Sequence, residues 1–408
     1  MTLSFENAVA AVREKAAAFK PVLSIEALPL DQALGRILAE EARADRDYPP
    51  FNRSMRDGFA VRSSDVATVP VELTVLGEIR AGSFFAGEVH PRQCVSIMTG
   101  APLPRGADAV VMVEHTETVG SSVRILRSVG PSENVVQQAS EARANRPVLA
   151  AGRLIGVGEI GILASIGMTK VRVYRQPTVA ILSTGDEVVP ISGKPEWFQV
   201  RNSNATILAA EVASAGGKPV ALDIARDDPE HLRRLLQEGL EADMLLTSGG
   251  VSAGKHDLVE GVLKELGGEF FFDGVDLRPG RPLVFGAVHN KLFFGLPGNP
   301  VSTYVTCSLF ARPVIRVLGG GEFTERLFLR ARLARAVKHK AALTAFMPAR
   351  VFPSLCREGS DPAVELVAWQ GSGDLMGVAA ANCFLVLHPG QTALAAGDWV
   401  DVMPREPA

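Results

Sequence analysis

The chain has 408 residues, enough for roughly two to four domains with ample cores. Hydrophobic residues make up 47% of it and charged residues 21%, as in ordinary globular proteins. The net charge of −3 gives no reason to expect nucleic acid or an anionic membrane surface as a partner. No apolar run approaches the roughly 18 residues that a membrane span needs, and the N-terminus has no signal-peptide pattern.

The spacing of the cysteines and histidines argues against Cys/His metal sites and zinc hydrolase sites. The four cysteines lie far apart, without a CxxC pair or a Cys/His metal spacing, which predicts reduced thiols and a cytoplasmic protein. The seven histidines are scattered without an HExxH motif, so a zinc hydrolase is not expected. No catalytic Ser/His/Asp triad is recognisable in the sequence, so a hydrolase with a covalent intermediate is not supported.

Two stretches are predicted to form one elongated, partly helical N-terminal domain, residues 1–45 and residues 141–176. Ser4 is placed to cap a first helix. Pro29 and Asp31 are expected to begin a second helix within the same stretch. The two parts are separated by a region of different character, which predicts that this region is an insertion.

The inserted region, residues 46–140, is predicted to be a small β-rich domain. Its apolar residues alternate with others, and glycines and prolines break the runs at short intervals. Two loops stand out, at residues 49–59 and 96–104. Asp57 lies in the first and Thr99 in the second. At both positions an ordinary turn residue explains the sequence as well as a functional role does.

Strands alternate with helices from residue 177 to 320, which predicts a three-layer α/β domain with a largely parallel sheet. In such sheets ligands bind beyond the carboxyl ends of the strands. Residues 321–408 consist of short alternating runs that indicate a small barrel or sandwich, and we predict a small C-terminal β-barrel. The fold class is therefore multidomain α/β.

The polar loop at residues 247–257 follows a predicted strand and precedes a predicted helix. It contains three glycines, which let a backbone approach a ligand closely. A helix N-terminus presents free N–H groups to an anion. Asp257, at the expected helix start, either caps the helix or holds a divalent metal. A tight turn with an ordinary cap explains this loop equally well.

Further polar segments follow other strands of the α/β region. They are residues 183–187, the pair Arg278 and Arg281, and residues 296–302. Carboxylates beside phosphate-compatible loops predict Mg²⁺ bridged to a phosphorylated ligand, and guanidinium groups match an oxyanion. Each segment also has a structural explanation: Asp186 braces its turn, the arginines are solvated, and the prolines stiffen a helix start. Convergence on one sheet edge favours a binding site.

These segments together resemble the molybdopterin molybdenumtransferase family, which comprises bacterial MoeA and the E domain of gephyrin. The resemblance runs through nearly the whole chain. The α/β region alone also resembles molybdopterin adenylyltransferases and competence-damage proteins. The segments at residues 54–59 and 97–101 distinguish the chain from both. The most specific segments are Ser54-Met-Arg-Asp-Gly-Phe59, Ile97-Met-Thr-Gly-Ala101, Leu182-Ser-Thr-Gly-Asp-Glu187, Ser248-Gly-Gly-Val-Ser252 with Asp257, Arg278-Pro-Gly-Arg-Pro282 and Gly295-Leu-Pro-Gly-Asn-Pro300.

The resemblance implies a molybdopterin molybdenumtransferase that uses adenylylated molybdopterin and molybdate. Such an enzyme cleaves the pyrophosphate link with Mg²⁺, releases AMP and leaves molybdenum on the dithiolene. The implied catalytic residues are Asp57, Thr99, Glu187 and Asp257, and the implied metal ligands are Asp186, Glu187 and Asp257. The implied substrate-binding residues are Ser183, Thr184, Gly185, Ser248, Gly249, Gly250, Ser252, Arg278, Arg281, Pro297, Gly298, Asn299 and Pro300.

The chain departs from the usual family pattern at three places. Arg56 and Phe59 stand where the commoner loop has methionine and tyrosine. Where many family members have Gly-Glu-Asp near the end of the β-rich domain, this chain has Ser140-Glu141-Ala142. An acidic contact of the family is therefore either missing here or moved to Glu141. Arg281 replaces a lysine, which keeps the charge and changes the geometry. These differences leave tungsten open as an alternative to molybdenum.

The resemblance also implies partners. In the family, an elongated homodimer sets the β-rich domain of one chain against the α/β domain of the other, so each site is shared. Contact with a molybdopterin adenylyltransferase is expected as well. Two alternatives remain: a non-catalytic molybdopterin-binding scaffold, and a pyrophosphate hydrolase of the competence-damage type. Retained carboxylates argue against a pure scaffold, and AMP release with and without molybdate separates the three.

Overall fold

The computed structural model describes most of the chain and divides it into two compact units. Unit 1 comprises Met1–Ala27, Gly35–Ala39 and Arg172–Ala408, and unit 2 comprises Leu28–Leu34 and Glu40–Val171. The predicted division into four domains is finer than this and stays a prediction. The described residues are 2–19, 24–250, 258–339, 343–352 and 361–405.

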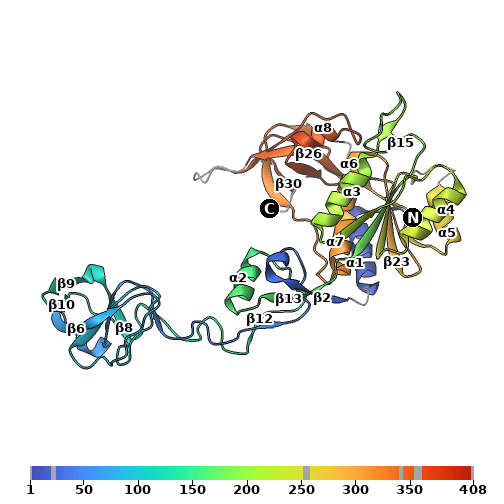
Figure 1. Cartoon of the computed structure of the whole chain (residues 1–408). Coiled ribbons are helices and arrows are strands. Elements are labelled where there is room, and N and C mark those ends of the chain that lie inside the picture. Colours follow the sequence, from blue (N-terminus) through green and yellow to red (C-terminus); the bar gives the residue numbers. More distant parts are fainter. Residues whose placement is uncertain (1, 20–23, 251–257, 340–342, 353–360, 406–408) are drawn as a thin grey trace. The chain divides into compact units, whose positions relative to one another are not determined.

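Unit 2 is built around a six-stranded mixed sheet (Figure 1). All neighbours in it are antiparallel except β6 and β7, which are parallel. Val110 and Val111 pack in different apolar clusters because successive strand residues point to opposite faces. Both faces are therefore covered. In spatial order the strands are β8 (Ala109–Met112), β5 (Gly58–Val61), β7 (Gln93–Ile97), β6 (Val71–Ile79), β10 (Ser122–Ile125) and β9 (Thr116–Val119).

The rest of unit 2 consists of short helices and two-stranded pairs. One helix, α2, covers Val157–Ser165, in agreement with the partly helical character predicted for residues 141–176. Short 3-10 helices lie at Ser63–Val66 and Val113–His115. Two strand pairs complete the unit: β3 (Ala42–Arg43) with β12 (Pro147–Leu149), and β4 (Arg53–Ser54) with β11 (Val135–Val136).

The prediction of a second helix beginning at Pro29 and Asp31 is wrong. Strand β2 runs over Ile25–Pro29, and it is followed by a single 3-10 turn at Leu30–Gln32. Gly35 then adopts a φ of 77°, which a continuing helix cannot accommodate. Leu38 is buried and bridges to Val173 in β13 (Lys170–Tyr174) as extended chain. Tertiary pairing thus overrides the local helical pattern.

Unit 1 contains the predicted α/β domain. Strands β17, β14, β18 and β23 pair in parallel, and the last two pairings, β23 with β22 and β22 with β19, are antiparallel, so the prediction of a largely parallel sheet is confirmed. Ser183 at the end of β14 lies opposite Ser248, which lies opposite Leu296. In spatial order the strands are β17 (Lys218–Ala221), β14 (Thr178–Ser183), β18 (Met244–Ser248), β23 (Lys291–Leu296), β22 (Val284–Val288) and β19 (Glu269–Phe272).

Helices cover both faces of this sheet, which makes the domain three-layered (Figure 1). Val179 and Ile181 of β14 pack under one layer, whereas Ala180 and Leu182 pack under the other. Ser4 accepts a hydrogen bond from the Asn7 amide and caps the first helix, as predicted. The first layer consists of α1 (Phe5–Ala18), α3 (Ser203–Ser214), α6 (Pro300–Thr306) and α7 (Arg312–Leu318). A π-helical stretch at Cys307–Ala311 joins α6 to α7. The second layer consists of α4 (Pro229–Gly239) and α5 (Leu258–Glu265).

The C-terminal part of unit 1 is a closed five-stranded barrel, as predicted. Closure follows because β26 pairs with β28 as well as with β27. The barrel strands in order are β26 (Thr344–Phe352), β27 (Ala363–Leu366), β24 (Leu329–Leu333), β30 (Trp399–Pro404) and β28 (Cys383–Leu387). Beside the barrel lie α8 (Leu375–Ala380) and β21 (Leu277–Arg278). The remaining strand pairs of the chain are β1 (Thr2–Leu3) with β20 (Gly274–Val275), β2 with β13, β15 (Val188–Val189) with β16 (Val200–Arg201), and β25 (Val337–Lys338) with β29 (Ala393–Leu394).

The thiols that the structure describes, Cys94, Cys307 and Cys383, are buried and free. Burial raises the pKa of Cys94 to about 12 and that of Cys383 to about 11, so both stay protonated. The fourth cysteine, Cys356, lies outside the described residues. Within the described ranges, none of the helices has the length and apolarity to cross a membrane.

Asp243 ties together the amino ends of β14 and β18. Its carboxylate accepts hydrogen bonds from Arg175 at 2.8 and 3.0 Å, and from the amide and hydroxyl of Thr178 at 2.7 and 2.9 Å. Burial acts to raise the pKa of Asp243, but these donors outweigh it and lower the pKa from 3.8 to about 2. The ionised form therefore stabilises the fold.

We expect Asp243→Asn to lower the free energy of unfolding by about 2 kcal/mol at pH 7. The folded pKa lies below the unfolded one, so this contribution is present above pH 3.8 and is lost as the pH falls toward 2. Urea denaturation should show the difference from wild type about halved at pH 3. Glu238→Gln, at an exposed position of α4, is the control and should change little. A difference independent of pH would contradict the role assigned to the charge.

Candidate functional site

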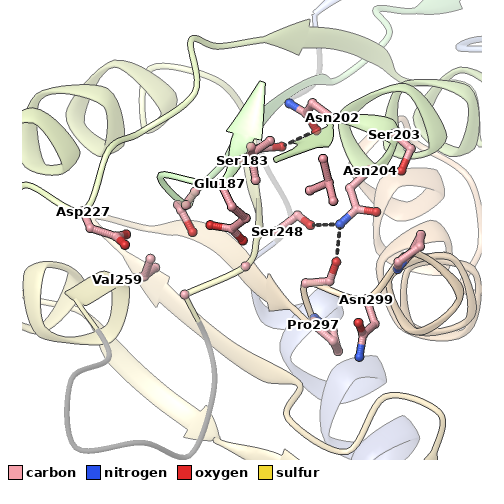
Figure 2. Close-up of a pocket in the computed structure, with 18 of the residues that line it drawn as sticks. Ser183, Glu187, Asn202, Ser203, Asn204, Asp227, Ser248, Val259, Pro297 and Asn299 are labelled. Atoms are coloured by element: carbon pink, nitrogen blue, oxygen red, sulfur yellow. Dashed lines mark hydrogen bonds between the residues drawn. The ribbon is translucent and has the colours of Figure 1, made fainter. Parts of the chain in front are cut away.

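A cavity of about 1190 Å³ opens at the carboxyl ends of β14, β18 and β23 in unit 1 (Figure 2). The in-line register of Ser183, Ser248 and Leu296 brings the loops after these strands side by side. This is the edge at which parallel α/β sheets bind ligands. The predicted site residues that line the cavity are Ser183, Thr184, Gly185, Glu187, Ser248, Gly249, Gly250, Pro297, Gly298, Asn299 and Pro300.

The backbone conformation and the close packing at positions 249 and 250 both require glycine. Their φ angles are 89° and 66°, in the left-handed region that favours glycine. A Cβ on Gly249 would lie 2.9 Å from the carbonyl oxygen of Thr184, and one on Gly250 would lie 2.7 Å from Cγ2 of Val259. The Gly249 amide also donates to the Leu296 carbonyl at 3.2 Å. Glycine therefore lets this loop pack directly against the loops on both sides.

The first turn of α3 ties the strand-end loops together. Asn202 caps the helix by accepting from the Ala205 amide at 3.1 Å, and it also accepts from the Ser183 hydroxyl at 3.0 Å. Asn204 donates through Nδ2 to Oγ of Ser248 and to the carbonyl of Gly298, both at 2.7 Å. Figure 2 shows these bonds between the loops.

Neither asparagine is among the site residues predicted from the sequence, although α3 begins at Ser203, directly after Asn202. The detectable signal was Asn202, a residue type that strongly favours the N-cap position. Asn204 carries no comparable signal, because its two acceptors come from distant parts of the chain.

Carboxylates gather on the opposite side of the cavity. Glu187 and Asp227 both line it, and the Asp227 amide lies 3.4 Å from Oδ1 of Asp186. Burial raises the pKa of Asp227, and the charges of Asp186 and Glu187 raise it further. A cation would relieve this repulsion, and carboxylate oxygens are suitable ligands for Mg²⁺. Even so, no three Asp, Glu, His or Cys side chains in the described part of the chain are grouped closely enough to hold a metal by themselves.

Asp227 is the second residue that sequence reasoning missed. It directly precedes Asp228, which caps α4 by accepting from the His231 amide, with Pro229 at the first helical position. The capping motif explains the local sequence without assigning any role to Asp227. The position of Asp227 beside Asp186 depends on tertiary structure.

The segment around Arg278 and Arg281 is placed differently from the other predicted parts. Arg278 lies in β21, which pairs with β26 of the barrel, and both arginines are exposed. Their side chains do not line the cavity, whereas Pro282 of the same segment does. Asp186 also contributes no lining atoms, although it adjoins Asp227. The roles assigned to these three residues stay predictions.

In unit 2 the structure brings Asp57 and Thr99 together, although 42 residues separate them. The Asp57 carboxylate accepts hydrogen bonds from the amide and the hydroxyl of Thr99, both at 2.7 Å. These two bonds lower the pKa of Asp57. The predicted loops also bond through their backbones, since Gly100 donates to Ser54 at 2.8 Å and Ser54 donates to Ala101 at 3.0 Å. The two side chains are thus held together and the charge of Asp57 is stabilised, whereas the catalytic roles assigned to them stay predictions.

Two predicted site residues, Ser252 and Asp257, lie outside the described residues. Their assigned roles stay predictions.

Known proteins resemble the chain over its whole length. Residues 3–167 match the MoeA N-terminal region (domain I and II), residues 180–317 a probable molybdopterin binding domain, and residues 330–404 the MoeA C-terminal region (domain IV). The molybdopterin molybdenumtransferase of Staphylococcus epidermidis is 34% identical, over 92% of this chain and 90% of that protein. The protein of the same name from Nostoc sp. is 35% identical, over 93% of this chain and 88% of that one.

Solved structures agree with these sequence matches. A molybdopterin biosynthesis MoeA protein from Pyrococcus horikoshii has a TM-score of 0.74 at 29% identity and covers 100% of both chains. A second structure of such a protein from the same organism has a TM-score of 0.81 at 25% identity, with 99% of this chain and 100% of that one covered. The match to curated relatives above 30% identity over most of both chains settles the family. The chain belongs to the molybdopterin molybdenumtransferase family.

Proposed function

We propose that this protein, an enzyme of molybdenum cofactor biosynthesis, uses adenylylated molybdopterin and molybdate as substrates. It cleaves the pyrophosphate link with the help of Mg²⁺, releases AMP and leaves molybdenum on the dithiolene. The observation that carries the proposal is the cavity at the strand ends, which combines a tight glycine loop with hydroxyl groups and carboxylates. Its volume of about 1190 Å³ is large for a small-molecule site and suits a substrate with two ring systems.

The carboxylate side of the cavity fits Mg²⁺. Asp186 and Glu187 would hold the ion together with substrate phosphate oxygens, since Mg²⁺ in phosphate chemistry usually needs one or two protein carboxylates. The raised pKa of Asp227 supports this fit, because its causes include the two neighbouring negative charges. When bound, Mg²⁺ neutralises charge that develops on the cleaved phosphates.

The glycine loop and the hydroxyl groups bind the phosphates in this proposal. Gly249 and Gly250 allow close backbone approach, and the hydroxyls of Ser183 and Thr184 lie at the same edge. Asp57 stays ionised because Thr99 lowers its pKa, so it acts as a hydrogen-bond acceptor that positions an attacking oxygen, and not as a proton donor.

The proposal is tested by measuring AMP release from adenylylated molybdopterin with and without molybdate. We expect release that depends on Mg²⁺ and molybdate, together with molybdenum retained on the pterin. Release without molybdate and without metal insertion would identify a pyrophosphate hydrolase. Tight pterin binding without any release would identify a scaffold. A parallel reaction with tungstate tests the alternative metal.

Glu187→Gln should lower the rate of AMP release by roughly 100-fold, because it removes a charge that the reaction needs at the cavity wall. The apparent affinity for Mg²⁺ should fall as well, and titration of Mg²⁺ in the AMP-release assay measures both effects. Glu196→Gln is the matched control, since Glu196 is exposed and lies outside the cavity lining. Unchanged Mg²⁺ dependence in Glu187→Gln would remove Glu187 from the metal site.

Thr99→Val should raise the pKa of Asp57, because one of the two hydrogen bonds that lower it is lost. The amide bond remains, so the loop should keep its conformation. The acidic limb of the pH–rate profile should therefore move to higher pH, with AMP release at high pH recovering part of its rate. A lowered rate with an unshifted profile would show that Thr99 contributes by some route other than the charge of Asp57.

The homodimer with shared sites, and the contact with a molybdopterin adenylyltransferase, stay predictions of the family resemblance. The same holds for a cytoplasmic location.

A further inference from the structure

Arg226 is held at the strand-end edge of the sheet, next to the loop that follows β14. The Ala225 amide donates to the carbonyl of Ser183 at 2.8 Å, and the Gly185 amide donates to the carbonyl of Ala225 at 3.1 Å. Ala225 is fully buried and bridges to Thr184 in parallel. These contacts extend the sheet beyond β17 and fix the main chain from which the Arg226 side chain leaves.

The guanidinium group of Arg226 lies beside the same loop. Its Nη1 donates to the carbonyl of Asp186 at 3.2 Å, and Gly185 and Glu187, on either side of Asp186, both line the cavity. Arg226 lines the cavity as well, and it is exposed. A molecule in the cavity can therefore reach this group.

The positive charge of Arg226 has no carboxylate partner among the described residues. There its guanidinium group makes one hydrogen bond, to a main-chain carbonyl. A guanidinium group carries several N–H donors, so most of them are left for a ligand. Within the described lining of the cavity, Arg226 and Arg201 are the arginines and there is no lysine, whereas the side chains of Arg278 and Arg281 do not line it. An anion that needs a cation at the cavity wall would therefore meet Arg226 or Arg201.

The position of Arg226 distinguishes it from Arg201. Arg201 donates through Nε to the carbonyl of Gly193 at 3.1 Å, in the segment that joins β15 to β16. Arg226 directly precedes Asp227, which lines the carboxylate side of the cavity with Glu187 (Figure 2). An anion bound beside these carboxylates would be repelled unless a cation lay next to it. Arg226 supplies such a charge on that side.

We propose that Arg226 binds a tetrahedral oxyanion of the substrates at the carboxylate side of the cavity. The inference rests on the proposed function, whose two substrates both provide such a group: a phosphate of the pyrophosphate link, or molybdate. The planar guanidinium group donates in parallel to two oxygens of such an anion. Arg226 thus acts beside Mg²⁺, which Asp186 and Glu187 would hold, and offsets the repulsion between the anion and these carboxylates.

Matched probes test the inference by calorimetric titration in the presence of Mg²⁺. AMP and adenosine differ by the phosphate group, and molybdate is the second anion. The wild-type protein should bind AMP about tenfold or more tightly than adenosine. Arg226→Gln removes the charge and keeps an N–H donor for the carbonyl of Asp186. It should lower the AMP-to-adenosine ratio by about tenfold, or weaken molybdate binding by about the same factor.

Arg234→Gln is the matched control, because Arg234 is exposed on α4 and lies outside the described lining of the cavity. It removes the same charge and should retain both the ratio and the affinity for molybdate. Arg201→Gln examines the other arginine of the lining in the same way. Arg226→Lys keeps the charge without the planar fork, and it is the second variant in case Arg226→Gln does not fold. It should show a smaller loss, about threefold.

A lowered AMP-to-adenosine ratio in the Arg226 variants assigns the phosphate to Arg226, and weaker molybdate binding assigns molybdate; either supports the inference. Unchanged values in these variants overturn it, and so does a loss that appears only in Arg201→Gln. Equal weakening of AMP and adenosine without any effect on molybdate would reveal a brace for the Asp186 turn and overturns it as well. The same holds for a wild-type protein that binds AMP no more tightly than adenosine and does not bind molybdate.

AMP release by the same wild-type preparation is measured alongside. Release without any Arg226-dependent change in anion binding overturns this inference alone. An Arg226-dependent change in anion binding without release overturns the proposed reaction alone.

Discussion

The candidate site depends on the register of three parallel strands. Because Ser183, Ser248 and Leu296 lie opposite one another, β14, β18 and β23 end at the same level and their loops meet. Buried apolar residues on both faces of the sheet hold this register, since a slip by one residue would turn the whole set toward the wrong layer. Asp243 adds a polar link at the opposite end of the strands. The cavity is thus a consequence of how the sheet is packed.

The cavity is chemically polarised. Asp186, Glu187 and Asp227 concentrate negative charge on one side, and the pKa of Asp227 is raised by burial and by these neighbours. The other side carries Asn204 and the prolines of the segment at residues 297–300, without carboxylates among the lining residues there. The proposed function fits this division, because a cation with phosphates requires carboxylates nearby and a flat ring does not.

Much of the architecture was predictable from the sequence, because it depends on local pattern. Alternation of strands and helices predicts the three-layer domain, and Ser4 and Asp228 are recognisable caps. Short alternating runs predict the small C-terminal β domain, whereas its closure depends on the pairing of β26 with β28. The helix expected after Pro29 shows the limit of this reasoning. There the chain is extended because Leu38 pairs with Val173, a partner that no local pattern reveals.

The sequence by itself determined the family and the strand-end motifs that supply part of the cavity lining, because these motifs are compact and stand at predictable strand ends. Tertiary structure alone decided that Asn204 reaches both Ser248 and Gly298, and that Asp227 joins the carboxylates of the first loop. It also separated Arg278 and Arg281 from the lining of the cavity, since their segment pairs with the barrel. The physical reason is the same in each case: hydrogen bonds and burial between distant segments depend on how the sheet and the barrel pack, and neighbouring residues in the chain do not encode that packing.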